Sequence, residues 1–227
     1  MKSKFCLAIE TTGVHLGVSL FSFDSLRPSR QERVKLISSF FEKQPFKQSD
    51  TLIPKIKEVL SRKRLSPKDL NLIAVDMGPG SFTGVRVGVA VARGFSQMLD
   101  IPAIGITSLE AMAEAYRQEN PEEKFIASCI TALQGEVYFS IYEIKNKSLK
   151  EIIPPCWKKE SEFNQAISKI NKSSSVAVCR SSESELNVPH SDIIAQLAIK
   201  KFQTLKKKAL FSQLVPLYLQ PMWAERL

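Results

Sequence analysis

The chain opens with short apolar runs separated by turn-forming residues. Residues 5–10 and 16–23 are rich in Leu, Ile, Val and Phe, and a short polar turn containing Gly13 separates them. Residues 34–41 have the same character and are followed by a polar break at Pro45. This pattern predicts a β-hairpin followed by a third strand.

Helical periodicity begins after this break. Behind a capping Ser49 or Asp50, apolar side chains recur at helical spacing at Leu52, Ile56, Val59 and Leu60. A short apolar run at 72–76 predicts a buried parallel strand, and a helix at 85–99, a strand at 101–106 and a helix at 108–117 follow it. The predicted order is strand-strand-strand-helix-strand-helix-strand-helix.

The second half of the chain begins with a similar pattern. The expected elements are strands at 125–132, 136–144 and 174–179, a strand ending at Pro154 and Pro155, and helices at 160–170 and 191–208. This repetition predicts two lobes, residues 1–105 and 106–227, with a final helix that could pack back on the first lobe.

Charge and cysteine usage narrow the class of protein. Lys and Arg total 32 against 23 Asp and Glu, a net charge of +9, which fits either a nucleic-acid neighbour or a solvated basic surface. The lysine runs at 200–201 and 206–208 carry the same two interpretations. No apolar run approaches the roughly 18 residues that cross a bilayer, and the scattered cysteines form no C-x-x-C pair. We expect a cytoplasmic protein with reduced thiols and no membrane association.

The most informative motif is the segment GPGSFTG at residues 78–84. It lies between an apolar strand and a helix, where ligands meet strand ends in α/β folds, and its glycines could let the backbone approach a phosphate. The Walker A lysine is absent, and the glycine spacing is not the dinucleotide fingerprint. A tight structural turn needs the same glycines, so both interpretations stand.

The helix after this motif has one side almost without side chains. Gly84, Gly88 and Ala92 recur every four residues, which permits a close backbone approach. The neighbour could be the protein's own sheet or the helix of another subunit. Arg86 and Arg93 share a face of the same helix and could form ion pairs across a subunit boundary.

Groups for independent catalysis are scarce. The two histidines, His15 and His190, have no second histidine at metal-ligand spacing, and no G-x-S-x-G elbow occurs. His15 lies in the predicted hairpin turn and is expected to be exposed. We therefore expect no metal site and no catalytic residue.

Several segments together resemble the TsaB (YeaZ) family. They are LAIETT at the start, LIAVD followed by GPGSFTGVRVGVAVARG, GEVY at 135–138 and PLYL at 216–219. The resemblance covers nearly the whole chain and is weakest between 145 and 189. It implies a two-lobed actin-like α/β fold, as in sugar kinases, Hsp70 and actin, with ribonuclease H-like mixed sheets flanked by helices.

The resemblance also implies a function. TsaB proteins act with the catalytic subunit TsaD and the ATPase TsaE, which place threonylcarbamoyl on the adenosine 3′ of the tRNA anticodon. We expect a non-catalytic scaffold that meets tRNA through the complex and has no intrinsic cofactor. A homodimer of the chain alone, and ATP or ADP bound within the complex, are both compatible with the resemblance. The implied weak nucleotide site consists of Glu10, Thr11, Thr12, Gly78, Gly80 and Ser81.

Two departures from the family pattern weaken nucleotide chemistry. Glu10 stands where many relatives have Asp, and Thr131 stands where they often have Asp before GEVY.

The expected partner interface consists of Leu52, Ile56, Val59, Gly84, Val85, Arg86, Gly88, Val89, Ala92 and Arg93. The alternatives are a small phosphotransferase with GPGSFTG as its phosphate loop and Glu10 as its acid, and, ranked last, a plain RNA-binding module.

Overall fold

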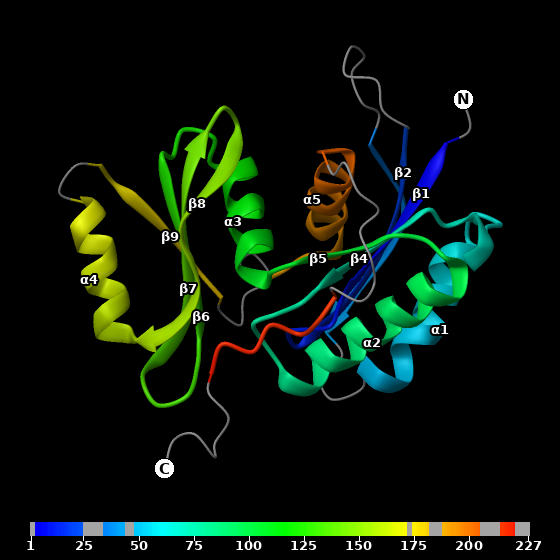
Figure 1. The fold of residues 1–227 in the computed structure, drawn as a ribbon, viewed down its shortest axis with the longest axis horizontal. Coiled ribbons are helices and arrows are strands. Elements are labelled where there is room, and N and C mark those ends of the chain that lie inside the picture. The colour runs from blue at the N-terminus through cyan, green and yellow to red at the C-terminus, as the bar shows by residue number, and fades with distance from the viewer. Residues whose placement is uncertain are drawn as a thin grey trace. The chain divides into compact units, whose positions relative to one another are not determined.

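The computed structural model describes residues 3–24, 34–43, 48–171, 174–181, 188–204 and 214–220. They form two compact units, one of residues 1–107 and 189–216 and the other of residues 108–188 and 217–227. The second unit is therefore not the continuous segment 106–227, because the chain returns to the first unit at residue 189 (Figure 1).

The first unit is built on a five-stranded mixed sheet in the order β3-β2-β1-β4-β5. Its strands are β1 (Lys4–Glu10), β2 (His15–Phe23), β3 (Lys35–Lys43), β4 (Leu72–Asp76) and β5 (Ala103–Ile106). The hairpin of β1 and β2 and the antiparallel strand β3 confirm the three predicted strands, and β4 runs parallel to both β1 and β5. Every residue of β4 is buried, as its continuous apolar sequence predicts.

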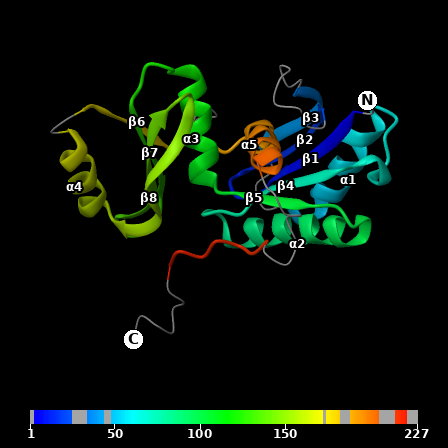
Figure 2. The same cartoon turned by 45° about the horizontal axis from the view of Figure 1, so that its top comes forward.

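Helices cover both faces of this sheet. The helices are α1 (Gln48–Ser61), α2 (Phe82–Leu99) and α5 (Ser191–Thr204), with a short 3-10 turn η1 (Pro67–Asp69) before β4. The side chains of α1 and α2 pack on Leu7, Ile9 and Val75, whereas α5 lies on the opposite face (Figure 2). Because side chains alternate along a strand, Glu10 and Asp76 belong to the face that α5 covers.

The second unit repeats the start of the first with a four-stranded sheet in the order β8-β7-β6-β9. Its elements are α3 (Ser108–Glu119), β6 (Phe125–Thr131), β7 (Glu136–Lys145), β8 (Ser148–Lys159), α4 (Glu160–Asn171) and β9 (Val176–Arg180). Met112 of α3 and Phe163 of α4 lie in separate apolar clusters on the two faces of this sheet. As in the first unit, a hairpin is followed by a strand parallel to its first member.

The end of β8 differs from the sequence prediction. Strand β8 does not stop at Pro154 and Pro155 but continues to Lys159. Because β8 is an edge strand with irregular register opposite Phe139, a proline that lacks an N–H can be accommodated there. The last helix is described only to Thr204, so Lys206, Lys207 and Lys208 lie outside the described residues.

Candidate functional site

The turn between β1 and β2 is organised around the carboxyl group of Glu10. This side chain is only 1% exposed, and its Oε1 accepts hydrogen bonds from Thr12 N at 2.6 Å, Thr12 Oγ1 at 2.9 Å and Gly13 N at 3.2 Å. Its Oε2 is buried and has no hydrogen-bond partner among the described residues. A buried carboxyl oxygen without a donor favours the neutral, protonated form.

Asp76 completes this site, and the sequence analysis did not select it. It is fully buried at the end of β4 and stands beside Glu10 because Ile9 is paired with Val75. Its Oδ1 accepts a hydrogen bond from Gly78 N at 2.7 Å, and its Oδ2 lies 3.1 Å from Thr12 Oγ1. The signal available in the sequence was an acid ending a buried strand, at the edge where ligands meet α/β sheets.

Burial and charge act together on this carboxyl pair. Desolvation, followed by the negative charge of Asp76, raises the pKa of Glu10 to about 8 despite the hydrogen bonds from Thr12 and Gly13, which lower it. Glu10 is therefore largely protonated at neutral pH. The pair then carries one proton, and at most one negative charge, at the end of the sheet.

The GPGSFTG segment closes directly onto this turn. Ser81 N donates to Thr12 O at 2.6 Å, Gly78 N is bonded to Asp76, and the Ser81 side chain caps α2 by accepting from Gly84 N at 3.2 Å. A Cβ at Gly80 would lie 2.5 Å from Thr12 O. The N–H groups of Gly78, Ser81 and Gly84 are therefore already hydrogen-bonded within the protein, and Thr12 fills the space beside Gly80.

The glycine stripe of α2 faces inward. Thr11 Oγ1 donates to Gly84 O at 2.7 Å, a Cβ at Gly84 would overlap Thr11 O, and one at Gly88 would overlap Thr11 Oγ1. Of the two interpretations of the stripe, close packing on the protein's own sheet is the one observed. The glycines allow α2 to lie against the end of β1.

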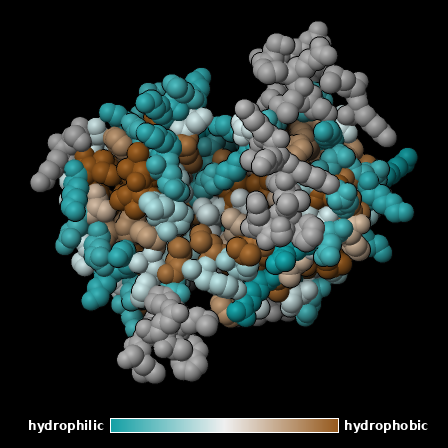
Figure 3. All heavy atoms as spheres, viewed as in Figure 1, coloured by the Kyte–Doolittle hydropathy of each residue, from teal (hydrophilic) through white to brown (hydrophobic). Residues whose placement is uncertain are grey.

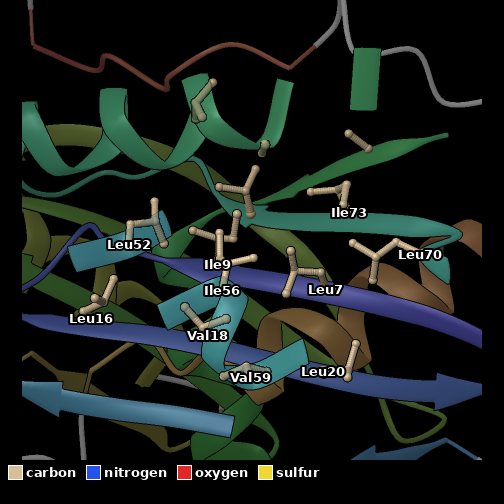
Figure 4. Close-up of a cluster of buried hydrophobic side chains, with 14 of the residues drawn as sticks. Leu7, Ile9, Leu16, Val18, Leu20, Leu52, Ile56, Val59, Leu70 and Ile73 are labelled. Carbon is tan, nitrogen blue, oxygen red and sulfur yellow. The ribbon is translucent and has the colours of Figure 1, made fainter. Parts of the chain in front are cut away.

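Most residues of the expected partner interface lie inside the first unit. Eight of its residues are buried within the first unit, namely Leu52, Ile56, Val59, Gly84, Val85, Gly88, Val89 and Ala92. Figure 4 shows Leu52, Ile56 and Val59 among side chains of β1 and β2. Arg86 and Arg93 are exposed, and the Arg86 guanidinium lies 3.6 Å from the centre of the Phe82 ring. Helical spacing identified the apolar faces of α1 and α2 correctly, but it did not predict that the protein's own sheet covers them.

His15 was expected to be exposed, and the structure corrects this. It is 3% exposed and stacks on Phe41 at 4.9 Å, and Phe41 stacks in turn on His190 at 4.4 Å. This stack joins His15 to β3 and, through Phe41, to the segment before α5, both of which lie far away in the sequence. Across the described residues, no group of three or more His, Cys, Asp and Glu side chains is arranged to hold a metal.

The corresponding end of the second sheet has different chemistry. Thr131 ends β6, and its Oγ1 lies 3.4 Å from Nη1 of Arg180, which ends β9. Arg180 also forms a two-pronged ion pair with Glu160, at 2.5 and 3.2 Å. This end of the second sheet thus has an ion pair between Arg180 and Glu160, whereas the corresponding end of the first sheet has the carboxyl groups of Glu10 and Asp76.

The two units define an α/β fold with mixed sheets flanked by helices, which a solved YeaZ structure shares. The structure "YeaZ from Pseudomonas aeruginosa" superposes with a TM-score of 0.70 at 18% identity, covering 95% of this chain and 100% of that chain. No helix among the described residues is both long and apolar enough to span a membrane.

Sequence comparisons identify the family. A family model described as TsaD, tRNA N6-adenosine threonylcarbamoyltransferase, matches residues 47–213. A "tRNA threonylcarbamoyladenosine biosynthesis protein TsaB" of Buchnera aphidicola subsp. Schizaphis graminum is 31% identical over 75% of this chain and 71% of its own length. The chain belongs to the TsaB family.

Other relatives align over shorter stretches. The protein with the same description from Bacillus subtilis is 32% identical over 65% of this chain, and the one from Escherichia coli is 34% identical over 47%. These alignments span 59% and 46% of the lengths of the two relatives.

Proposed function

We propose that this chain is a non-catalytic scaffold subunit in the synthesis of threonylcarbamoyladenosine in tRNA. It would act with TsaD and TsaE, which transfer threonylcarbamoyl to the adenosine 3′ of the anticodon, and meet tRNA within that complex. Family membership and the printed names of its relatives support the pathway. The observation that carries the scaffold role is the closed junction in which Glu10, Thr12, Asp76 and the GPGSFTG loop use one another as hydrogen-bond partners.

The outward side of α2 supports a revised partner surface. Phe82 is 57% exposed beneath Arg86, and Arg93 is exposed on the same flank. Ala90 and Gly94 are also exposed, and a Cβ at Gly94 would meet nothing within 4 Å. Small residues one turn apart let another helix approach closely. We propose that TsaD packs here, and that a second copy of the chain takes its place when TsaD is absent.

Reconstitution tests the scaffold role. A tRNA transcript is incubated with TsaD, TsaE, ATP and the threonylcarbamoyl donor, with and without this chain, and the modified nucleoside is measured by mass spectrometry after digestion. We expect formation of the nucleoside only when the chain is present, and no steady-state ATP hydrolysis by the chain alone. Full modification without the chain would overturn the proposal. So would ATP turnover by the isolated chain that Glu10→Gln abolishes.

A substitution on the open face of α2 tests the partner surface. Gly94→Arg places a long side chain where the structure has free space, so folding is preserved while a packed partner helix is excluded. Asn164→Arg, on the exposed side of α4, is the matched control. Capture of TsaD should be lost for Gly94→Arg and kept for Asn164→Arg. Equal capture by both variants would place the interface elsewhere. Gly88→Arg would be uninformative because that position is buried against Thr11.

A further inference from the structure

Several exposed cations of the first unit lie at one end of its sheet. Asn71 Oδ1 accepts from Phe5 N at 2.8 Å, so the loop after α1 lies at the start of β1. Lys4 is paired with Phe23 and Lys35 with Ser22, which places both lysines at this same end. We define the basic edge as the side chains that gather there, namely Lys4, Lys35, Lys63, Arg64 and Lys68.

Helix α5 brings further positive charge to the basic edge. Ser191 at its start is bonded to Ser19 in the middle of β2, whereas Phe202 near its end contacts Phe23 and Lys4. The helix therefore runs towards the basic edge and carries Lys200 and Lys201 in that direction. The opposite end of the sheet has the acids Glu10, Glu42, Asp50, Asp76 and Asp192, with Lys43 and Arg86. The basic edge also has acids, namely Asp24 beside Phe23 and Asp69 in η1.

The cations of the basic edge are available to an external anion. Lys35, Lys63, Arg64 and Lys68 are exposed, and none of the four forms an ion pair with a described residue. Arg62, beside them, is bonded to Glu58. The negative end of the α1 dipole accounts for only part of this cluster, since Lys35 begins a strand and Lys68 lies in η1. In Figure 3, hydrophilic side chains project at the margin where Figure 1 shows the turn after α1.

Arg64 breaks a local rule of helix termination. Leu65 N donates to Leu60 O and Arg64 N to Ser61 O, which is the hydrogen-bond pattern of a Schellman motif. Arg64 occupies the left-handed position of that motif, with φ 55°, where glycine is the favoured residue. An arginine at this position is unfavourable for the backbone. Asp100, Gln134, Asn146 and Lys147 have the same conformation, so it does not by itself mark a functional residue.

We propose that the basic edge is a binding surface for the phosphate backbone of RNA. Exposed cations without an ion-pair partner among the described residues come from a strand, a helix end and a 3-10 turn, an arrangement suited to sequence-independent phosphate contacts, and the net charge of +9 favours a polyanion. That the RNA is tRNA rests on the proposed function, whereas the surface itself rests on the charge distribution. The chain would then contact tRNA itself, at the end of the sheet opposite Glu10 and Asp76.

Charge reversal with a matched control tests this surface. The variant Lys63→Glu/Arg64→Glu/Lys68→Glu is compared with Lys145→Glu/Lys147→Glu/Lys150→Glu, which changes the net charge equally at exposed sites around the β7–β8 turn. Binding of a fluorescently labelled tRNA transcript to the full chain is followed by anisotropy across a salt series. We expect the edge variant to bind about tenfold or more weakly, with the slope of log K against log salt reduced by about two to three, and the control to change little.

Other outcomes would overturn the proposal. Equal weakening by both variants would mean that net charge alone attracts RNA, and unchanged binding by both would place the RNA elsewhere. Selective loss of binding to phosphatidylserine vesicles, with tRNA binding unchanged, would assign the edge to a membrane surface. TsaD capture, measured separately, should be unchanged in the edge variant, so failure here is distinguishable from failure of the scaffold role.

A single substitution separates binding from folding. Arg64→Gly relieves the left-handed backbone while removing one cation, so the melting temperature should stay the same or rise while tRNA affinity falls severalfold. Asp100→Gly, at the left-handed residue that ends α2, is the control for the backbone effect. Unchanged tRNA affinity in Arg64→Gly, or a melting temperature below wild type, would contradict the role assigned to Arg64.

Discussion

Glu10 and Asp76 meet through a single hydroxyl group. Thr12 Oγ1 lies 2.9 Å from Glu10 Oε1 and 3.1 Å from Asp76 Oδ2, inside a junction with no measurable exposure at Asp76. A hydroxyl has one proton, so it can donate to only one of the two carboxyl groups at a time. Both contacts are hydrogen bonds only when one of the carboxyl groups is protonated and supplies the other proton. The geometry and the raised pKa of Glu10 therefore indicate the same shared-proton state.

This state predicts a specific pH dependence of stability. The pKa of Glu10 is about 8 in the folded chain and near 4.5 in the unfolded chain, so folding takes up a proton between these values. The contribution of Glu10 to the free energy of unfolding should therefore be largest below about pH 4.5. It should fall as the pH rises to about 8. Glu10→Gln has no such proton, so its stability relative to wild type should increase over this range by a few kcal/mol.

Urea unfolding at a series of pH values measures the effect. Glu10→Gln and wild type should diverge as the pH rises, because only the wild type loses stability through this carboxyl group. Asp76→Asn provides the control, because removing the neighbouring charge lowers the pKa of Glu10. The free energy of unfolding should then fall over a narrower pH range. Parallel stability curves for wild type and Glu10→Gln would show that Glu10 is ionised in the folded chain.

The two ends of α2 offer a matched pair of glycine substitutions. Gly84→Ala should destabilise the chain by several kcal/mol, because its Cβ would overlap the Thr11 carbonyl oxygen, a backbone atom that cannot move alone. Gly94→Ala should stabilise it by about 0.5–1 kcal/mol, since the position is open and alanine is the better helix former. Chemical denaturation of both variants checks the signs. A mild effect of Gly84→Ala would mean that α2 is not seated on Thr11.

Local sequence patterns predicted the helices and strands of this fold better than they predicted which of these elements pack together. Alternation and helical spacing identified the hairpin, the buried strand β4 and the apolar side of α1, because these depend on neighbouring residues. The direction of the glycine stripe depends on Thr11, 73 residues before Gly84. A stripe of small residues indicates only that something approaches closely, and spacing alone does not identify it.

The candidate site was predicted only in part for the same reason. Glu10 and Thr12 were selected from the first strand and its turn, but Asp76 becomes their neighbour only through the parallel pairing of β1 with β4. His15 stacks on Phe41, and Phe41 stacks on His190 in the segment before α5, and neither residue is near His15 in sequence. Contacts between distant segments thus decided both which acid completes the site and which surface remains free.

The four cysteines should differ in reactivity. Burial raises the pKa of Cys129 to about 11 and that of Cys179 to about 12, and Cys6 is also buried with a raised pKa. Burial also raises the pKa of Cys156, although this residue is partly exposed in β8. A thiol reagent at neutral pH should therefore modify Cys156 first and slowly, as peptide mass spectrometry would show. Cys156→Ser should abolish early labelling, and rapid labelling of Cys129 or Cys179 would contradict their burial.

The attachment of α5 to the first sheet can be tested with a double-mutant cycle. Ser19 Oγ and Ser191 Oγ lie 2.7 Å apart, and both residues are buried. Ser19→Ala or Ser191→Ala leaves one buried hydroxyl without this partner and should cost about 1–3 kcal/mol. The double variant removes both hydroxyls, so its cost should be less than the sum of the two single costs. The free energies of unfolding of the four proteins give the coupling directly. Additive costs would mean that the two hydroxyls do not depend on each other, and that α5 is held to β2 by apolar packing alone.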